Sequence, residues 1–375
     1  MINIPNKDQW QKMNEHLASI AGALGTQLDV STWSGVQKAV RAGMGPVLFP
    51  IGTSLKVTHD TYGELQFDVV AHDQFKSARD DDAHTMTLMC HDLIARIQFD
   101  APEALYYAND ILPADRYKFS VVTKFSEWLV GEYDFELLND LPQGGSLCIS
   151  GNPATALTAL KVMAYDAGNA LLEECDIRTS SSFPSALPLD GMDGLNHLSR
   201  VAYGSDNYKE SAIRQFLNSS AAAGSVWTPQ TWFDRPPTWS DSTAGFLYGI
   251  DSEFLGVVGE VKVPCIANDS YEAPDSTTKT GETYVLEDKF YLASAKEVLD
   301  AGDKVPEDGS TVYAFFKGAS NADRIKYFSG SARVWGSRSP YTTNAYSCCC
   351  INTDGTFYSA VMSTSLGVAP VCNIV

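Results

Sequence analysis

Hydrophobic residues near the start of the chain recur at alternating spacings of three and four positions, the a/d pattern of a short coiled coil. They are Trp10, Met13, Leu17, Ile20 and Leu24. Two heptads are too short to be stable alone in water. We interpret residues 1–44 as a helical segment that oligomerises and anchors the chain. The alternative is a pair of amphipathic helices packed on the domain that follows.

A second helix is predicted within the same segment. Ser31 or Thr32 can cap its N-terminus, and Gly43 would end it. Its apolar positions are Trp33, Val36 and Val40.

After Gly45 the pattern changes to short runs typical of β-strands, at residues 47–52, 55–59 and 65–73. Further β-like runs are separated by Pro and Gly turns and cover residues 117–125, 133–140 and 144–150. Residues 153–174 instead predict a helix. Short strands, few helices and long loops predict an α+β fold. We expect a domain formed by residues 45–100 and 186–375, interrupted by a β-rich insertion at 101–185.

The charge of the chain excludes several functions. The formal net charge is −19. A protein with this charge repels phosphate backbones, and it offers no basic patch to a membrane surface. No apolar run is long enough to cross a membrane, so no membrane insertion is expected, and the N-terminus lacks the features of a secretory signal. We therefore expect a protein made in a bacterial cytoplasm that binds no nucleic acid.

The eight cysteines show no spacing typical of a zinc site. We expect five of them to be buried as small hydrophobic residues. These are Cys90, Cys148, Cys175, Cys265 and Cys372.

Five ordered motifs carry a resemblance to a known family. They are residues 206–219 (DNYKESAIRQFLNS), 245–255 (GFLYGIDSEFL), 288–294 (DKFYLAS), 335–340 (WGSRSP) and 367–370 (GVAP). Together they resemble C-type-lectin-fold proteins of phages and prophages, whose fold is related to that of formylglycine-generating enzymes. Many members are similar to the variable proteins of diversity-generating retroelements. The resemblance implies a C-type lectin fold with long irregular loops.

The motifs also have a physical interpretation. The first predicts a helix with Ile213, Phe216 and Leu217 on its buried face. In the fourth, Arg338 could bridge loop carbonyls or a carboxylate. Relatives often carry a bulky residue where this chain has Gly336 and Ser337. We assign a structural frame to Trp335, Arg338, Pro340 and Gly367.

The segment from Tyr341 to Leu366 has an unusual composition. At the overall charged content of 19%, a segment of this length would hold about five charged residues. It holds only Asp354, and Lys, Arg, Glu, Gln, His and Trp are absent. Most residues present are products of an AAC codon whose adenines have been replaced, as an error-prone reverse transcriptase would do. The three adjacent cysteines fit this account, because TGC is one such product.

We therefore predict a variable region at about 335–370, in which residues 352–356 and 367–370 form a fixed frame, with solvent-facing ligand-binding positions. These positions are Tyr341, Thr343, Tyr346, Ser347, Cys348, Cys349, Phe357, Tyr358, Ser359, Ala360, Val361, Ser363, Thr364 and Leu366. Two alternatives remain open: an ordinary exposed Ser/Thr-rich hairpin, and a thiol function of the cysteines.

Residues 69–92 contain a second candidate site, rich in Asp and His, which could hold Ca²⁺ or a transition metal. No metal-ligand spacing is present, so we favour a solvated loop and expect neither a metal nor a cofactor. No nucleophile elbow, phosphate loop or dinucleotide motif occurs either, and we expect no enzyme activity.

The favoured function is that of a phage tail-tip receptor-binding protein in the virion, whose partner is a host cell-surface protein or glycan. The resemblance implies a homo-oligomer, preferably a trimer, attached to other tail proteins through its N-terminal segment. The alternatives are a bacterial surface adhesin of the same fold and a formylglycine-generating-type oxidase.

Overall fold

The computed structural model describes residues 29–100, 103–108, 113–121, 131–140, 146–150, 160–165, 171–175, 177–180, 206–228, 236–266, 283–299, 304–305, 307–342 and 347–375. The predicted coiled-coil seam from Trp10 to Leu24 lies outside the described residues. So do two predicted ligand-binding positions, Thr343 and Tyr346.

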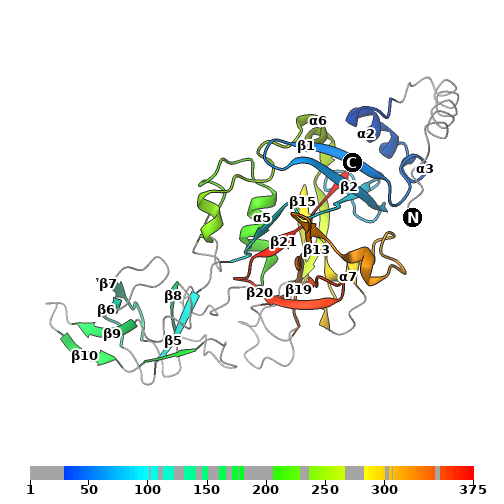
Figure 1. The fold of residues 1–375 in the computed structure, drawn as a ribbon. Helices are drawn as coiled ribbons and strands as arrows, with labels where there is room; N and C mark the ends of the chain where they lie inside the picture. The colour runs from blue at the N-terminus through cyan, green and yellow to red at the C-terminus, as the bar shows by residue number, and fades with distance from the viewer. Residues whose placement is uncertain are drawn as a thin grey trace.

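Two curled sheets form the main body (Figure 1). The first runs in the order β1-β2-β3-β22-β12, and β15 also pairs with β22. Its strands are β1 (Ser54–His59), β2 (Gly63–His72), β3 (Met86–Cys90), β12 (Val258–Gly259), β15 (Phe290–Leu292) and β22 (Pro370–Ile374).

The second sheet runs in the order β20-β19-β18-β21-β4, with β18 and β21 parallel and the other pairs antiparallel. Its strands are β4 (Ala95–Ile97), β18 (Trp335–Pro340), β19 (Ser347–Ile351), β20 (Phe357–Val361) and β21 (Leu366–Val368). Two small ribbons complete the body: β13 (Val261–Ile266) with β14 (Thr283–Asp288), and β16 (Tyr327–Phe328) with β17 (Ser331–Ala332).

The helices are short and lie around these sheets. The α-helices are α2 (Trp33–Arg41), α3 (Gly45–Leu48), α5 (Ala212–Leu217), α6 (Ser252–Val257) and α7 (Ala295–Val298). The 3₁₀ turns are η1 (Tyr208–Glu210), η2 (Thr238–Asp241) and η4 (Asn321–Arg324). Within the described residues, none of the helices is long and apolar enough to cross a membrane. This mixture confirms an α+β protein with few helices.

Two helices predicted from the sequence are confirmed. The side chain of Thr32 accepts a hydrogen bond from the backbone N–H of Gly35 and caps α2. The ring of Trp33 then packs on that of Phe254 in α6, with the ring centres 4.7 Å apart. In α5 the predicted face of Ile213, Phe216 and Leu217 is buried in the core.

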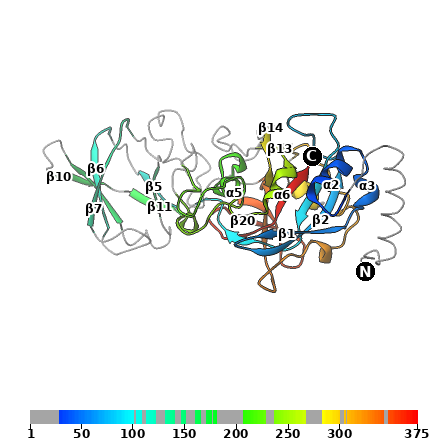
Figure 2. The same ribbon diagram turned by 90° about the horizontal axis from the view of Figure 1, so that it is seen from above.

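Seven further strands form two separate sheets, in the orders β10-β9-β6-β7 and β11-β5-β8. They are β5 (Glu103–Ala108), β6 (Arg116–Val121), β7 (Gly131–Glu136), β8 (Ser146–Ser150), β9 (Leu160–Tyr165), β10 (Leu171–Cys175) and β11 (Ile177–Ser180). Both views place these strands beside the main body (Figures 1 and 2). The exact limits of the insertion stay a prediction.

Two predicted elements are wrong. Residues 153–174 were expected to be helical, but 160–165 and 171–175 form β9 and β10, because pairing of β9 with β6 overrides local helix propensity. The run at 47–52 was expected to be a strand, but Gly45–Leu48 form α3. Pro46 stands in the first turn of α3, where its missing N–H costs nothing.

Candidate ligand-binding surface

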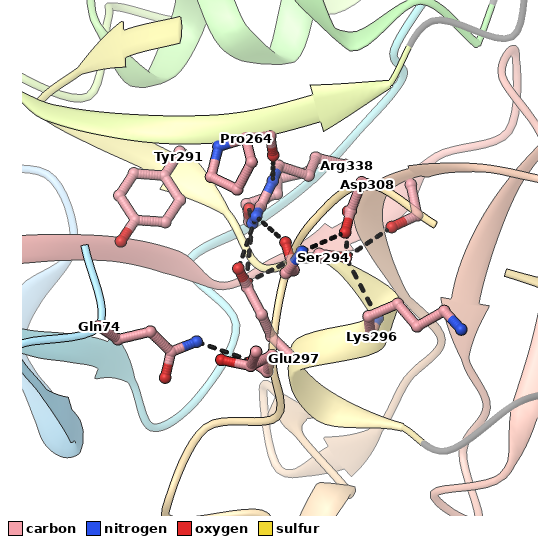
Figure 3. Close-up of polar contacts among 12 residues, drawn as sticks. Gln74, Pro264, Tyr291, Ser294, Lys296, Glu297, Asp308 and Arg338 are labelled. Carbon is pink, nitrogen blue, oxygen red and sulfur yellow. Dashed lines mark hydrogen bonds and ion pairs between the residues drawn. The ribbon is translucent and has the colours of Figure 1, made fainter. Parts of the chain in front are cut away.

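The frame of the C-terminal region is built around the guanidinium of Arg338, which lies fully buried on β18 (Figure 3). It forms a two-pronged ion pair with Glu297 of α7, with Nη1 2.8 Å from Oε2. It also donates to the backbone oxygens of Leu292 and Pro264, at 2.8 and 3.1 Å, and to Ser310 Oγ at 3.0 Å. The prediction that Arg338 could bridge a carboxylate is therefore confirmed, whereas the two carbonyls that it binds belong to strands β15 and β13 and not to loops.

This ion pair is stable in its charged form. Burial by itself lowers the pKa of Arg338, but the charge and hydrogen bonds of Glu297 outweigh burial and raise the pKa well above its ordinary value. Because both partners are fully buried, loss of either one leaves an uncompensated charge in the core. The pair therefore holds β18, α7 and the 308–311 loop as one unit.

A chain of serine and aspartate side chains extends the frame from Arg338 (Figure 3). Ser294 Oγ donates to Asp308 Oδ2 at 2.6 Å and lies 2.9 Å from Ser339 Oγ, which accepts from the backbone N–H of Ala295. Ser294 and Glu297 form a capping box at the start of α7. The spacing of Ser294 and Glu297 was visible in the sequence, but their partners on β18 were not.

The other frame residues are buried as well. Trp335 is fully buried, and Nζ of Lys326 lies 5.7 Å from the centre of its ring. The same Nζ donates a hydrogen bond to the backbone oxygen of His91 at 2.8 Å. A Cβ at Gly367 would lie 2.4 Å from Leu93 Cδ1 and 3.0 Å from the oxygen of Val334, so this position needs glycine for space. At Gly336, Phe99 and Leu366 fill the volume that a larger side chain would otherwise occupy.

Strand β19 contains the three cysteines in the interior of the second sheet, between β18 and β20. Cys348 and Cys350 face the main core, with their sulfur atoms 3.4 Å apart, while Cys349 faces Ala295 and Val305 on the other side. Burial raises the pKa of Cys348 and of Cys349. These thiols are packing residues in this structure.

The expectation of solvent-facing side chains is therefore wrong for part of the predicted set. Both faces of β19 are covered, and the neighbouring β20 and β21 turn one or more side chains into the core. The buried positions are Ser347, Cys348, Cys349, Ala360 and Leu366. Outside this set, Cys90, Cys265 and Cys372 are buried as predicted.

The remaining predicted positions lie on both faces of β20, in the turn after it and at Tyr341, and together we call them the β20 surface. Its members are half-buried or exposed: Tyr341, Phe357, Tyr358, Ser359, Val361, Ser363 and Thr364. Tyr358 is 46% exposed. On the other face of the strand, the rings of Phe357 and Tyr341 lie 6.0 Å apart, and Lys304 Nζ lies 5.3 Å from the centre of the Phe357 ring.

The turn that joins β19 to β20 contains the residues predicted to be fixed. Gly355 has a φ of +79°, and a Cβ there would lie 1.8 Å from the backbone oxygen of Asn321. Asp354 Oδ1 accepts hydrogen bonds from the N–H and the hydroxyl of Thr356. The turn thus holds the β20 surface in place.

The Asp- and His-rich segment does not converge on a metal. His84 pairs with Asp73 at 3.0 Å, and His91 pairs with Asp68 at 2.6 Å. His72 contacts the backbone oxygen of Phe49 instead. Among the described residues, no group of three or more His, Cys, Asp or Glu side chains could hold a metal ion.

Comparison with known proteins assigns the C-terminal part of the chain. No curated protein matches the sequence, and no solved structure matches the fold. One family, described as "Domain of unknown function (DUF6273)", matches residues 169–375, which is more than half of the chain and includes the whole of the second sheet except β4. The chain therefore belongs to the DUF6273 family.

Proposed function

We propose that this protein is a receptor-binding protein of a phage or prophage tail, and that the β20 surface contacts the receptor. The observation that carries the proposal is the composition of residues 341–366, in which Asp354 is the single charged residue. Adenine-directed mutagenesis of asparagine codons would produce such a segment. Aromatic and small polar side chains of this kind also suit a recognition face.

The arrangement of the β20 surface supports this proposal. Its exposed and half-buried residues lie on one strand and its flanking turns, next to a frame fixed by Arg338 and Glu297. Side chains on such a surface can change without disturbing the core. The buried positions of β19 cannot vary in this way, so we confine the variable surface to β20, Tyr341, Ser363 and Thr364. Thr343 and Tyr346 stay predicted members.

We further propose a C-type lectin fold for this domain. The motifs shared with that family support it, as does an α+β body with few helices and long connections. We propose that the predicted seam from Trp10 to Leu24 within residues 1–44 assembles the chain into a trimer and attaches it to other tail proteins in the virion, since the apolar face of α2 is buried in the main core. The partner is then a host cell-surface protein or glycan.

The alternatives have less support. A bacterial surface adhesin of the same fold would use the same β20 surface. A formylglycine-generating-type oxidase would need reactive thiolates in an open groove. The closest thiols, Cys348 and Cys350, are fully buried, and burial raises the pKa of Cys348 well above its ordinary value. This pair does not favour the oxidase.

The experiment is a binding assay of the labelled full-length chain on a panel of bacterial strains. A combined Tyr358→Ala, Ser359→Ala and Thr364→Ala variant should lose cell binding while its melting temperature stays nearly unchanged, because these side chains are exposed or half-buried and lie outside the core. The matched control is Tyr248→Ala, another exposed tyrosine (51%) that lies outside the β20 surface.

The receptor role of the β20 surface is wrong if the triple variant binds cells as the parent does. The diversification part has its own test. A reverse transcriptase gene and an adenine-rich repeat matching residues 335–375 should lie beside the coding sequence, and their absence would contradict it.

A further inference from the structure

We propose that the open edge of β20 binds an extended segment of a partner polypeptide, which adds a strand to the five-stranded sheet. The inference rests on the proposed function and names the class of its partner. Among the described residues, β20 is the terminal strand of its sheet and pairs only with β19. Its other edge can therefore accept a further strand.

The register shows which backbone groups lie on this edge. In an antiparallel pair, hydrogen-bonded and non-hydrogen-bonded residue pairs alternate. The N–H of Asn352 donates to the oxygen of Thr356 at 2.8 Å, so that pair is a hydrogen-bonded one. The next hydrogen-bonded pairs are Cys350 with Tyr358 and Cys348 with Ala360. The backbone groups of the alternate residues of β20 then point away from β19.

Contacts on the far side of β19 agree with this alternation. The oxygen of Ser347 accepts from the N–H of Tyr341, and the oxygen of Cys349 accepts from Ser337 Oγ. Both oxygens therefore point toward β18 and away from β20. Their partners on β20 are Val361 and Ser359, whose backbone groups must face the opposite, open side.

The outward groups are the N–H and C=O of Phe357 and of Ser359, and the N–H of Val361. The oxygen of Val361 is already used, since it accepts from the N–H of Thr364 at 2.9 Å. Within the described part of the chain, the other outward groups form no hydrogen bond. Two donors and two acceptors on consecutive outward residues, with a third donor beyond them, match the ladder of one added strand.

The edge also lacks the features that keep natural edges from pairing. Proteins protect exposed edges with charged residues, proline or bulges. Phe357–Val361 contains no charged residue and no proline, and it pairs with β19 without a register shift. β1, at the edge of the other sheet, by contrast carries the exposed Lys56. An unprotected edge on a strongly charged protein indicates that the edge is used.

The chemistry of the partner follows from the two faces of β20. The exposed Tyr358 and the half-buried Phe357 lie on opposite faces, so an added strand would contact an aromatic ring on each side. Because the paired stretch is uncharged and the chain carries a net charge of −19, the partner should be uncharged where it pairs and basic in its flanks. Backbone bonds would give a constant docking mode, and the side chains would set specificity.

The test uses the full-length chain and a displayed library of random linear peptides. Ser359→Pro removes one outward N–H without removing a bond to β19, and proline is tolerated on such an edge. Ser359→Ala changes the side chain and keeps the N–H. We expect selected peptides to bind the alanine variant within threefold of the parent, and the proline variant at least tenfold more weakly. Amide exchange at Phe357 and Ser359 should slow when peptide is bound.

Melting temperatures check that the proline variant folds. If the Ser359→Pro variant does not fold, the Val361→Pro variant takes its place in the same comparison, because it also removes an outward N–H. Ala360→Pro is the opposite control, because its N–H is bonded to Cys348 and its loss should destabilise the hairpin.

Three outcomes would overturn the inference: no linear peptide is enriched, the proline and alanine variants bind equally, or the edge mediates self-association of the chain that Ser359→Pro abolishes. The proposed function fails separately. If the triple variant described above loses cell binding but Ser359→Pro does not, the receptor role stands and the added strand is wrong. If peptides bind the chain but the chain binds no cells, the added strand stands and the receptor role is wrong.

Discussion

Strands β19 and β20 are similar in chemistry and pair residue by residue, but they have opposite environments. Both are short, uncharged and rich in small or aromatic residues. β19 lies between β18 and β20 with both faces covered, and all five of its residues are buried. In the part of the chain that the structure describes, β20 has one neighbouring strand, and one of its five residues is buried. The same low-charge composition therefore serves as core in one strand and as surface in the next.

The largest expected effect concerns the frame that both strands share. Arg338→Ala should lower the free energy of unfolding by about 3–5 kcal/mol, because Glu297 would stay buried without a partner. Urea denaturation measures the loss. Arg333→Ala is the control, since Arg333 is exposed in the same segment and should change stability by less than about 0.5 kcal/mol. Equal effects of the two variants would show that the ion pair does not hold the frame.

A smaller effect compares the two strands directly, at cross-strand partners. Cys350→Asn should cost about 1–3 kcal/mol, because it buries an amide without a hydrogen-bond partner. Tyr358→Asn, directly opposite on β20, should cost about 0.5 kcal/mol or less, because that side chain is 46% exposed. The midpoints of thermal or urea unfolding measure both. A Tyr358 variant as unstable as the Cys350 variant would break the distinction between core strand and surface strand.

The smallest effect lies away from the hairpin and compares a partly exposed ion pair, His91 with Asp68, with the fully buried pair of Arg338 and Glu297. The hydrogen bond with Asp68 raises the pKa of His91 above its ordinary 6.5. Burial alone would raise the pKa of Asp68, but hydrogen bonds from His91, Ser54 and Gln66 outweigh burial and lower it below its ordinary 3.8. The His91 contribution is complete below pH 6.5 and is lost as pH rises through the raised pKa. The Asp68 contribution is present above pH 3.8 and is lost on further acidification.

Comparison of the parent with His91→Gln should therefore show the largest stability difference near pH 5 and a smaller one at pH 8. Because the His91 side chain is 52% exposed, the difference should stay below about 1 kcal/mol. A difference that grows from pH 5 to pH 8 would contradict the assignment of this pair.

Local signals in the sequence were sufficient where an element depends on its own residues. Thr32 caps α2, and the spacing of Ile213, Phe216 and Leu217 marks the buried face of α5. Residues 352–356 were predicted as fixed frame from their composition and not as a turn, although a glycine at positive φ is a similarly local feature. A cap, a helical face and a turn each involve residues close together in the chain, so their physics can be recognised without the fold.

Only the tertiary structure decided what depends on distant pairing. Leu160–Tyr165 became a strand because β6 lies beside it, and Glu297 became the partner of Arg338 because α7 packs on β18. The sequence determined that residues 341–366 form a low-charge segment, with Asp354 as its single charged residue. It could not determine that β19 is enclosed and β20 is open, because the alternation of side chains along a strand does not tell which faces and edges the rest of the chain will cover.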